Sequence, residues 1–102
     1  MAVTYLIEFQ ARPERREAFL ERLNAVLDAM RHEAGFVSAT LHADPQDPHH
    51  FLLHETWRDH GEVVEVELHR PYRDAWHAAL PGLLAAPRRI GVWTPLRSDR
   101  RS

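Results

Sequence analysis

The sequence predicts an α+β fold in which helices pack on one face of a four-stranded antiparallel sheet. Three observations lead to this expectation. Four segments alternate apolar and polar side chains, which is the pattern of a strand. Two longer regions repeat apolar side chains every three or four residues, which is the pattern of a helix buried along one side. These segments follow one another in the order β-α-β-β-α-β, and a chain of 102 residues is long enough for one domain.

The first strand is expected at residues 3–11 and the first helix at residues 13–33. One face of the strand carries the apolar side chains of Val3, Tyr5, Ile7 and Phe9. Pro13 suits a first helical turn, and Gly35 ends the helix. The apolar stripe of the helix consists of Phe19, Leu23, Val26, Leu27 and Met30.

Two further strands are expected at residues 36–43 and 49–57, joined by a turn rich in Asp and Pro at residues 44–48. In the earlier strand, Val37, Ala39 and Leu41 are expected on one face, and Phe36, Ser38, Thr40 and His42 on the other. In the later strand, Phe51, Leu53, Glu55 and Trp57 are expected on one face, and Leu52, His54 and Thr56 on the other. This alternation sets the register of the strand, because a slip of one residue would exchange the two faces.

The second helical region is expected in two pieces. Asp59 is a suitable N-cap for a short helix at residues 61–69. Pro71 then begins a longer helix at residues 72–84, whose last turn Pro81 is expected to loosen. The apolar stripe of the longer helix consists of Ala75, Trp76, Ala79, Leu80 and Leu83.

The last strand is expected at residues 89–96. Its side chains divide between one side with Ile90 and Val92 and the opposite side with Trp93. The complete order of elements is the ferredoxin-like arrangement, a split β-α-β unit. Residues 1–97 are therefore expected to form a single domain, and residues 98–102 a disordered tail.

Composition and charge exclude several classes of function. Thirteen Lys and Arg residues oppose fifteen Asp and Glu residues, and the formal net charge is −2. A surface that binds nucleic acid or an anionic membrane is therefore not expected. No apolar run approaches the roughly 18 residues that cross a bilayer, and the N-terminus lacks the pattern of a secretion signal, so we expect a cytoplasmic protein. Cys is absent, which removes disulfides and thiol nucleophiles.

The helices of such a fold cover only one face of the sheet. The opposite face is expected to carry Leu52, His54 and Trp93, which a lone subunit would leave in water. A second copy of the same sheet is the simplest cover for this face. We therefore expect a homodimer that packs sheet on sheet.

One group of residues resembles a known family. The group consists of Glu33-Ala34-Gly35-Phe36, Leu41, Asp47-Pro48, Phe51 and the strand motif Glu55-Thr56-Trp57. In this spacing the chain resembles the antibiotic biosynthesis monooxygenase domain over about residues 3–96. The resemblance implies a dimeric α+β barrel with a pocket between sheet and helices. It also implies oxygenation of a quinol or a polycyclic phenol by O2 without a cofactor, although some members of the family degrade haem and others have no demonstrated activity.

Two positions depart from the family pattern. Relatives that degrade haem carry an axial His on the helix after the tryptophan, where this chain has Glu67, so haem degradation is disfavoured. Relatives that act on quinols often have a Pro-His pair, whereas here Pro71 is followed by Tyr72.

The candidate catalytic residues are Trp57, His69 and Tyr72, and the candidate substrate-binding residues are Tyr5, Phe9, Phe51, Glu55 and Trp76. The Trp57 N–H is expected to orient a substrate oxygen, while His69 or Tyr72 takes the phenolic proton. Trp57 fits a purely structural core position equally well. Glu55 also fits a buried carboxylate paired with Arg58 or with an Arg of the first helix, and His77 is expected to be exposed.

The leading hypothesis is an oxygenase that uses neither metal nor flavin, because an electron-rich phenolate can itself give an electron to O2. A non-catalytic dimer that binds a hydrophobic ligand, or acts in stress, is the alternative. A metal site is not expected, since the eight His residues form no recognisable ligand constellation. The four Gly residues are scattered and form no phosphate-binding loop, which argues against nucleotide ligands.

Overall fold

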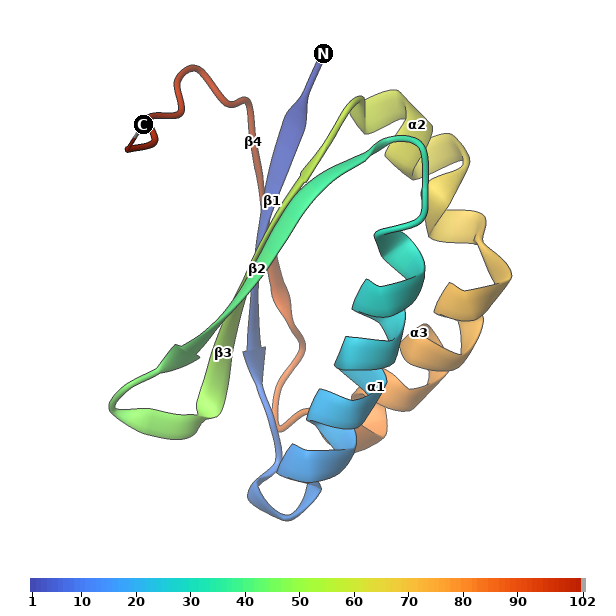
Figure 1. The fold of residues 1–102 in the computed structure, drawn as a ribbon. Coiled ribbons are helices and arrows are strands. Elements are labelled where there is room, and N and C mark those ends of the chain that lie inside the picture. Colours follow the sequence, from blue (N-terminus) through green and yellow to red (C-terminus); the bar gives the residue numbers. More distant parts are fainter. Residues whose placement is uncertain (102) are drawn as a thin grey trace.

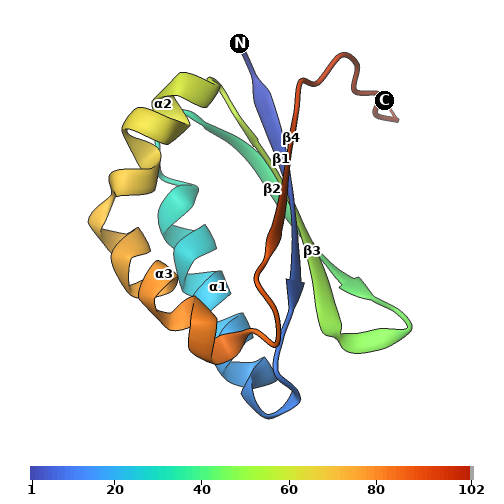
Figure 2. The ribbon, with the colours of Figure 1, turned by 180° about the vertical axis from the view of Figure 1, so that it is seen from behind.

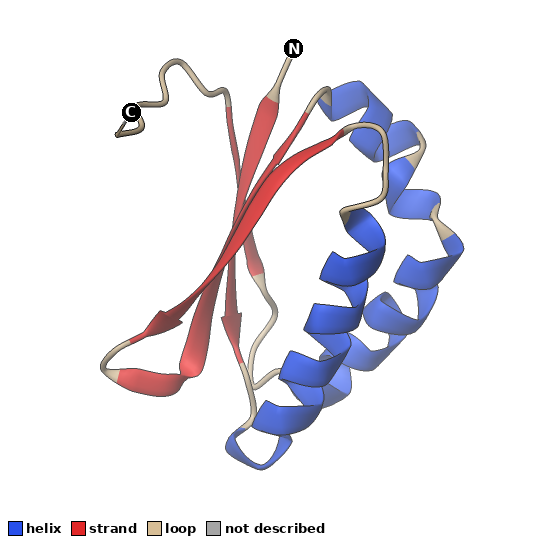
Figure 3. Ribbon diagram, in the orientation of Figure 1, coloured by secondary structure: helices blue, strands red, loops and turns tan. Residues whose placement is uncertain are grey.

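The computed structural model describes residues 1–101 and has the expected order of elements. The strands are β1 (Val3–Gln10), β2 (Phe36–Asp44), β3 (Asp47–Trp57) and β4 (Arg89–Trp93). The helices are α1 (Arg16–Met30), the short α2 (His60–Glu65) and α3 (Pro71–Leu83), with 3₁₀ turns η1 (Pro13–Arg15) and η2 (Glu67–His69). Figure 3 separates the two layers by colour, with the strands red and the helices blue.

The four strands form one sheet in the order β2-β3-β1-β4, and all neighbouring strands are antiparallel. All helices lie on one face of this sheet, with α1 beside α3, and the opposite face has no helix on it (Figures 1 and 2). The ferredoxin-like α+β prediction is therefore confirmed. Within residues 1–101, no helix has the length and hydropathy that crossing a bilayer requires.

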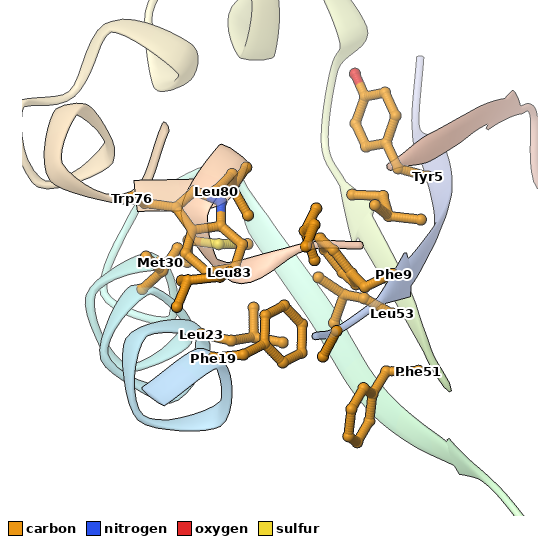
Figure 4. Close-up of a cluster of buried hydrophobic side chains, with 14 of the residues drawn as sticks. Tyr5, Phe9, Phe19, Leu23, Met30, Phe51, Leu53, Trp76, Leu80 and Leu83 are labelled. Atoms are coloured by element: carbon orange, nitrogen blue, oxygen red, sulfur yellow. The ribbon is translucent and has the colours of Figure 1, made fainter. Parts of the chain in front are cut away.

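The hydrophobic core lies between the sheet and the long helices. The face of β1 predicted from alternation is correct, since its members from Val3 to Phe9 are all buried. In Figure 4, Phe19, Leu23 and Met30 of α1 and Trp76, Leu80 and Leu83 of α3 face Phe9, Phe51 and Leu53 of the sheet. Phe19 has no exposed surface and lies at the centre of this cluster.

The predicted face of β2 is wrong at its first residues. The register with β3 shifts between Phe36 and Ser38, so this strand begins with a bulge. As a result Phe36 packs edge-on against the Trp57 ring at a centroid distance of 5.5 Å. Val37 instead lies on the open side of the sheet and is 59% exposed. Simple alternation does not reveal a bulge, because the extra residue changes the phase.

The second helical region divides as predicted but differs at Pro81. The helix α3 continues past this residue to Leu83, and the N–H of Leu84 still donates to the carbonyl of Leu80 at 3.0 Å. The expectation of a loosened last turn is therefore wrong. A proline removes only the hydrogen bond of its own nitrogen, and here the following turn closes without it.

The fourth strand is shorter than predicted, ending at Trp93 instead of residue 96. Residues 94–101 contain no helix or strand and extend on the side of the sheet opposite the helices (Figures 1 and 2). Disorder of residues 98–102 stays a prediction, and its last residue, Ser102, lies outside the described residues.

Candidate active site

A cavity of about 130 Å³ lies between the sheet and the helical region α2–α3, and we call it the inner chamber. Its lining consists of Tyr5, Ile7, Glu55, His60, Val63, Val64, Leu68, Arg73, His77, Arg88 and Ile90. Beside it, an outer groove of about 430 Å³ runs along the end of α3 and the loop that leads to β4. His77 and Arg88 line both spaces, so the chamber and the groove adjoin at these two side chains.

Pairing of the central strands explains why an aromatic hydroxyl and a carboxylate share this cavity. Tyr5 on β1 lies directly opposite Glu55 on β3, and the alternation of both strands turns these side chains toward the helices. In Figure 4, Tyr5 lies at the end of the core cluster, and its hydroxyl points away from Phe9. The inner chamber therefore begins where the apolar core ends.

The Tyr5 hydroxyl and Nδ1 of His60 are 2.6 Å apart, which is a short hydrogen bond. The hydroxyl donates when the imidazole proton is on Nε2. Asp59 caps α2 by accepting a hydrogen bond from the N–H of Glu62, which fixes the start of the helix that carries His60. Since Tyr5 is buried and His60 is exposed, the pair connects the chamber with solvent.

Burial raises the pKa of Tyr5 above its ordinary value of 10.0, and the neighbouring Glu55 raises it further. The phenol therefore holds its proton at neutral pH. A protonated phenol bonded to an imidazole can accept a proton from a chamber ligand only as it passes its own to His60. The arrangement suits a relay with the imidazole as the final base.

Glu55 is a buried carboxylate, and within residues 1–101 it forms no ion pair with a cationic side chain. Its Oε1 accepts a 3.2 Å hydrogen bond from Nε1 of Trp57. Burial raises the pKa of Glu55, and the positive charge of Arg73 opposes this rise only in part. The expected partner Arg58 instead forms an exposed ion pair with Glu62 at 2.6 Å, so the predicted Glu55–Arg58 pairing is wrong.

Arg73 contributes a guanidinium to the chamber wall from the first turn of α3. The residue is only 6% exposed, and in the described part of the chain its Nε and Nη2 atoms are buried without a hydrogen-bond partner. The guanidinium carbon lies 5.7 Å from the ring centres of both Trp57 and Tyr72. These stacking contacts hold the side chain in place but give no hydrogen-bond partner to Nε and Nη2.

His77 follows Arg73 by one helical turn and is partly buried, so the prediction of an exposed His77 is wrong. Burial lowers the pKa of His77, and the positive charges of Arg88 and Arg73 lower it further. Burial likewise lowers the pKa of Arg88. His77 is therefore a neutral imidazole at neutral pH, with a lone pair available for a proton.

Of the residues proposed from sequence, Tyr5 and Glu55 line the inner chamber. Trp57 is 1% exposed and lies behind it, in contact with Arg73 and Glu55. Three other candidates, Phe9, Phe51 and Trp76, pack around Phe19 in the core, with centroids 5.2, 5.3 and 6.0 Å from its ring. They belong to the hydrophobic core and do not line the chamber.

The two candidates near the helical junction lie elsewhere. His69 is exposed at the end of η2. Tyr72 lines a separate small hollow between α1 and α3, together with Trp76. Glu67 is buried and bonded to Arg70 at 3.4 Å. Arg70 also pairs with Glu33 at 3.0 Å, which ties η2 to the end of α1.

Four polar side chains of the chamber were not predicted as site residues from the sequence: His60, Arg73, His77 and Arg88. One signal was present, because Arg73 precedes Trp76 by three residues and Leu80 by seven, which places a charge on the buried stripe of α3. His77 then follows one turn later. His60 is the first residue of the short helix α2, and Arg88 lies in the connection before β4, so the apolar periodicity gives neither side chain a direction. Among residues 1–101, no cluster of three or more His, Asp or Glu side chains has a geometry suited to a metal ion.

Comparisons with known proteins agree with this architecture. A family model described as antibiotic biosynthesis monooxygenase matches residues 2–79. The solved structure of Rv0793 from Mycobacterium tuberculosis has a TM-score of 0.88 and 25% identity, covering 98% of this chain and 100% of that one. The structure of a mutant of SnoaB, a cofactor-independent oxygenase from Streptomyces nogalater, has a TM-score of 0.82 and 20% identity, with 95% of each chain covered.

A curated relative is the uncharacterized protein sll1783 of Synechocystis, which is 25% identical over 84 residues. The match covers 82% of this chain and 56% of that protein, so the chain spans little more than half the length of this relative.

Proposed function

Because the chain belongs to the antibiotic biosynthesis monooxygenase family, we propose that it is a cofactor-independent oxygenase acting on a quinol in the inner chamber. The observation that carries this proposal is the Tyr5–His60 hydrogen bond of 2.6 Å, which joins the buried chamber to an exposed imidazole. A base that reaches the chamber but releases its proton to solvent is what oxidation of a phenol requires.

The size of the inner chamber favours a substrate with a single ring and not a polycyclic phenol. A cavity of roughly 150 Å³ holds one benzene ring. The inner chamber has about 130 Å³, so a fused ring system would have to extend past His77 into the outer groove. Apolar side chains such as Ile7, Val63 and Ile90 suit the faces of a ring.

The proposed reaction is balanced without an external reductant. The Tyr5–His60 pair removes a phenolic proton, and the resulting phenolate gives one electron to O2. The ring radical and superoxide combine to form a C–O bond, and the ring hydroperoxide loses water to leave a hydroxyquinone. One oxygen atom enters the product and the other leaves as water. The protein supplies a base, a shielded cavity and orientation.

We propose that Trp57 acts through Glu55, since its indole N–H is bonded to that carboxylate and not directed at a ligand. The carboxyl group of Glu55 then faces the ring from the sheet side. In its protonated form it can donate a hydrogen bond to a quinol oxygen, and its raised pKa favours that form.

We also propose that the protein is a homodimer through the open sheet face. Val37 and Trp93 are each 59% exposed on this face, which is a large exposure for such apolar side chains. A hollow between them is lined by Leu6 and by Thr4, Thr40 and Thr56. Packing of a second sheet would cover this surface.

Oxygen consumption with freshly reduced hydroquinones tests the proposed activity. We expect uptake above the autoxidation rate with a methyl-substituted benzene-1,4-diol, unchanged after treatment of the protein with a chelator. A three-ring anthrone serves as the size comparison and is expected to react more slowly. If no hydroquinone is consumed above the autoxidation rate although one binds, the protein is a ligand-binding member of the family and the proposal is wrong.

A further inference from the structure

The feature of the inner chamber that a neutral quinol does not explain is Arg73. A buried guanidinium normally has its donors bonded to a carboxylate, a carbonyl or water, because burial of an unpaired charge is costly. Arg73 is 6% exposed, yet its Nε and Nη2 atoms are buried without partners within residues 1–101. The wall of the chamber therefore contains a positive charge with unused hydrogen-bond donors.

Glu55 does not neutralise Arg73. The Glu55 carboxylate is bonded to the indole of Trp57. Burial raises the pKa of Glu55 more than the positive charge of Arg73 lowers it. A carboxylate in direct contact with the guanidinium would instead have a lowered pKa. Glu55 is the only acidic side chain that lines the chamber in residues 1–101, and it forms neither a hydrogen bond nor an ion pair with Arg73 there.

The position of Arg73 in its helix adds to the cost. It is the third residue of α3, which begins at Pro71. The first turn of a helix carries the positive end of the helix dipole, where anions are favoured and cations are not. A buried cation at this position weakens the fold, and such a cost at a cavity wall is typical of a residue kept for binding.

A second guanidinium reaches the same cavity. Arg88 lies in the connection that precedes β4, lines the inner chamber, and is partly buried. Burial lowers the pKa of Arg88, so its charge is also poorly solvated. Arg73 and Arg88 come from separate segments of the chain, and Glu55 is the only acidic side chain among residues 1–101 that lines the chamber with them, so the lining has an excess of positively charged side chains.

We propose that Arg73 and Arg88 form an anion subsite in the inner chamber, and that this subsite binds the carboxylate of an aromatic acid. The planar guanidinium matches a carboxylate through two parallel hydrogen bonds, which would use the free donors of Arg73. The apolar residues of the chamber then enclose the ring. The inference rests on the proposed function for the chemistry of that ring and narrows its substrates to hydroquinones that bear a carboxylate.

Benzoate and benzamide separate the anion subsite from the oxygenase chemistry. The two molecules have nearly the same shape, only benzoate is charged, and neither has a phenolic hydroxyl to oxidise. Calorimetric titration of the full chain at neutral pH and low salt measures both dissociation constants. We expect benzoate to bind roughly ten- to a hundredfold more tightly, the difference expected for hydrogen bonds to a charged group.

Three variants test which side chain causes the preference for benzoate over benzamide. Arg73→Met keeps the apolar stem and is expected to abolish the preference for benzoate, while Arg88→Met weakens it. Arg31→Met is the matched control, because it removes a positive charge from an exposed position at the end of α1 and is expected to bind like the parent protein. Thermal unfolding without ligand checks the fold, and Arg73→Met is expected to be at least as stable as the parent.

Equal affinity for benzoate and benzamide in the parent protein, or no binding of benzoate at millimolar concentration, overturns the inference. So does an Arg73→Met variant that melts at a lower temperature but keeps its preference for benzoate, because Arg73 would then be structural. The proposed oxygenase activity is judged separately by comparing oxygen uptake with a neutral hydroquinone and with 2,5-dihydroxybenzoate. Uptake with both at equal rates supports the activity without the subsite, whereas binding of benzoate without any uptake supports the subsite alone.

Discussion

Trp57 donates a 3.2 Å hydrogen bond from its indole Nε1 to Oε1 of Glu55, two residues earlier on the same strand. Both side chains point toward the helices, and neither is more than 5% exposed. Phe36 packs against the indole from β2, and the Arg73 guanidinium lies over it from α3. The indole therefore has a fixed position from which it orients the carboxylate that faces the inner chamber.

Trp57→Phe is expected to lower the free energy of unfolding by roughly 1–3 kcal/mol, because a buried carboxylate loses its donor. The loss should be larger at neutral pH than at acidic pH, where Glu55 is protonated. Urea unfolding at two pH values measures the difference. Trp76→Phe is the matched control, since Trp76 is also buried in the core and no carboxylate in residues 1–101 bonds to it, and its destabilisation should not depend on pH.

Glu55→Gln is expected to gain stability relative to the parent protein as the pH rises. Burial raises the pKa of Glu55 in the folded protein above its ordinary value of 4.5. The folded state thus holds the proton more tightly than the unfolded state, and the parent loses stability as the pH rises from 4.5 through the folded-state pKa. The amide has no such dependence.

Glu62→Gln provides the control of opposite sign for that experiment. Its bond to Arg58 lowers the pKa of Glu62, so the native carboxylate stabilises the fold above its ordinary pKa. The Glu62→Gln variant is therefore expected to lose stability relative to the parent protein as the pH rises. Unfolding curves from acidic to neutral pH for both variants decide the matter, and parallel curves for Glu55→Gln and the parent would show that Glu55 is solvated.

Tyr5→Phe and His60→Ala are each expected to lower kcat/KM for a hydroquinone by roughly a hundredfold, the usual contribution of one general base. The double variant should be no slower than either single variant, because the two groups act as one relay. Tyr72→Phe distinguishes this assignment from a role at the helical junction. If Tyr72→Phe is the slow variant and Tyr5→Phe is fast, the relay assignment is wrong.

Light scattering is expected to give the mass of a dimer at micromolar concentration. Trp93→Glu should shift the protein to a monomer, because it replaces an exposed apolar side chain of the open sheet face with a charge. Val66→Glu is the control, since Val66 is 45% exposed but belongs to the helical layer. A parent protein that is monomeric at this concentration would contradict the dimer.

The sequence predicted the fold well because strands and helices bury one side each. Alternation assigned the inward faces of β1 and β3 correctly, and Tyr5 and Glu55 reached the chamber for that reason. It failed at Val37, where a bulge shifts the phase, since a bulge depends on pairing with the neighbouring strand.

The residues of the candidate site were harder to predict from the sequence. Large aromatic side chains such as Phe51 and Trp76 satisfy the pattern of a pocket wall and the pattern of a core equally well, and the structure places both in the core. The cations of the chamber depend on how α3 and the connection before β4 approach the sheet. That approach is a tertiary property, and spacing along the chain does not contain it.

The pairing of β1 with β4 brings the two ends of the chain together, with Thr4 opposite Trp93. Contacts across such a large sequence separation form late in folding, because nearly the whole chain has to close as a loop. An edge strand of five residues also opens locally at less cost than global unfolding. Ile90 belongs to β4 and Arg88 directly precedes this strand, so fraying of β4 removes one wall of the chamber while both long helices stay folded. We therefore expect a ligand to enter and leave the chamber when β4 opens locally. A bound acid is expected to slow amide hydrogen exchange in β4 more than in any other strand.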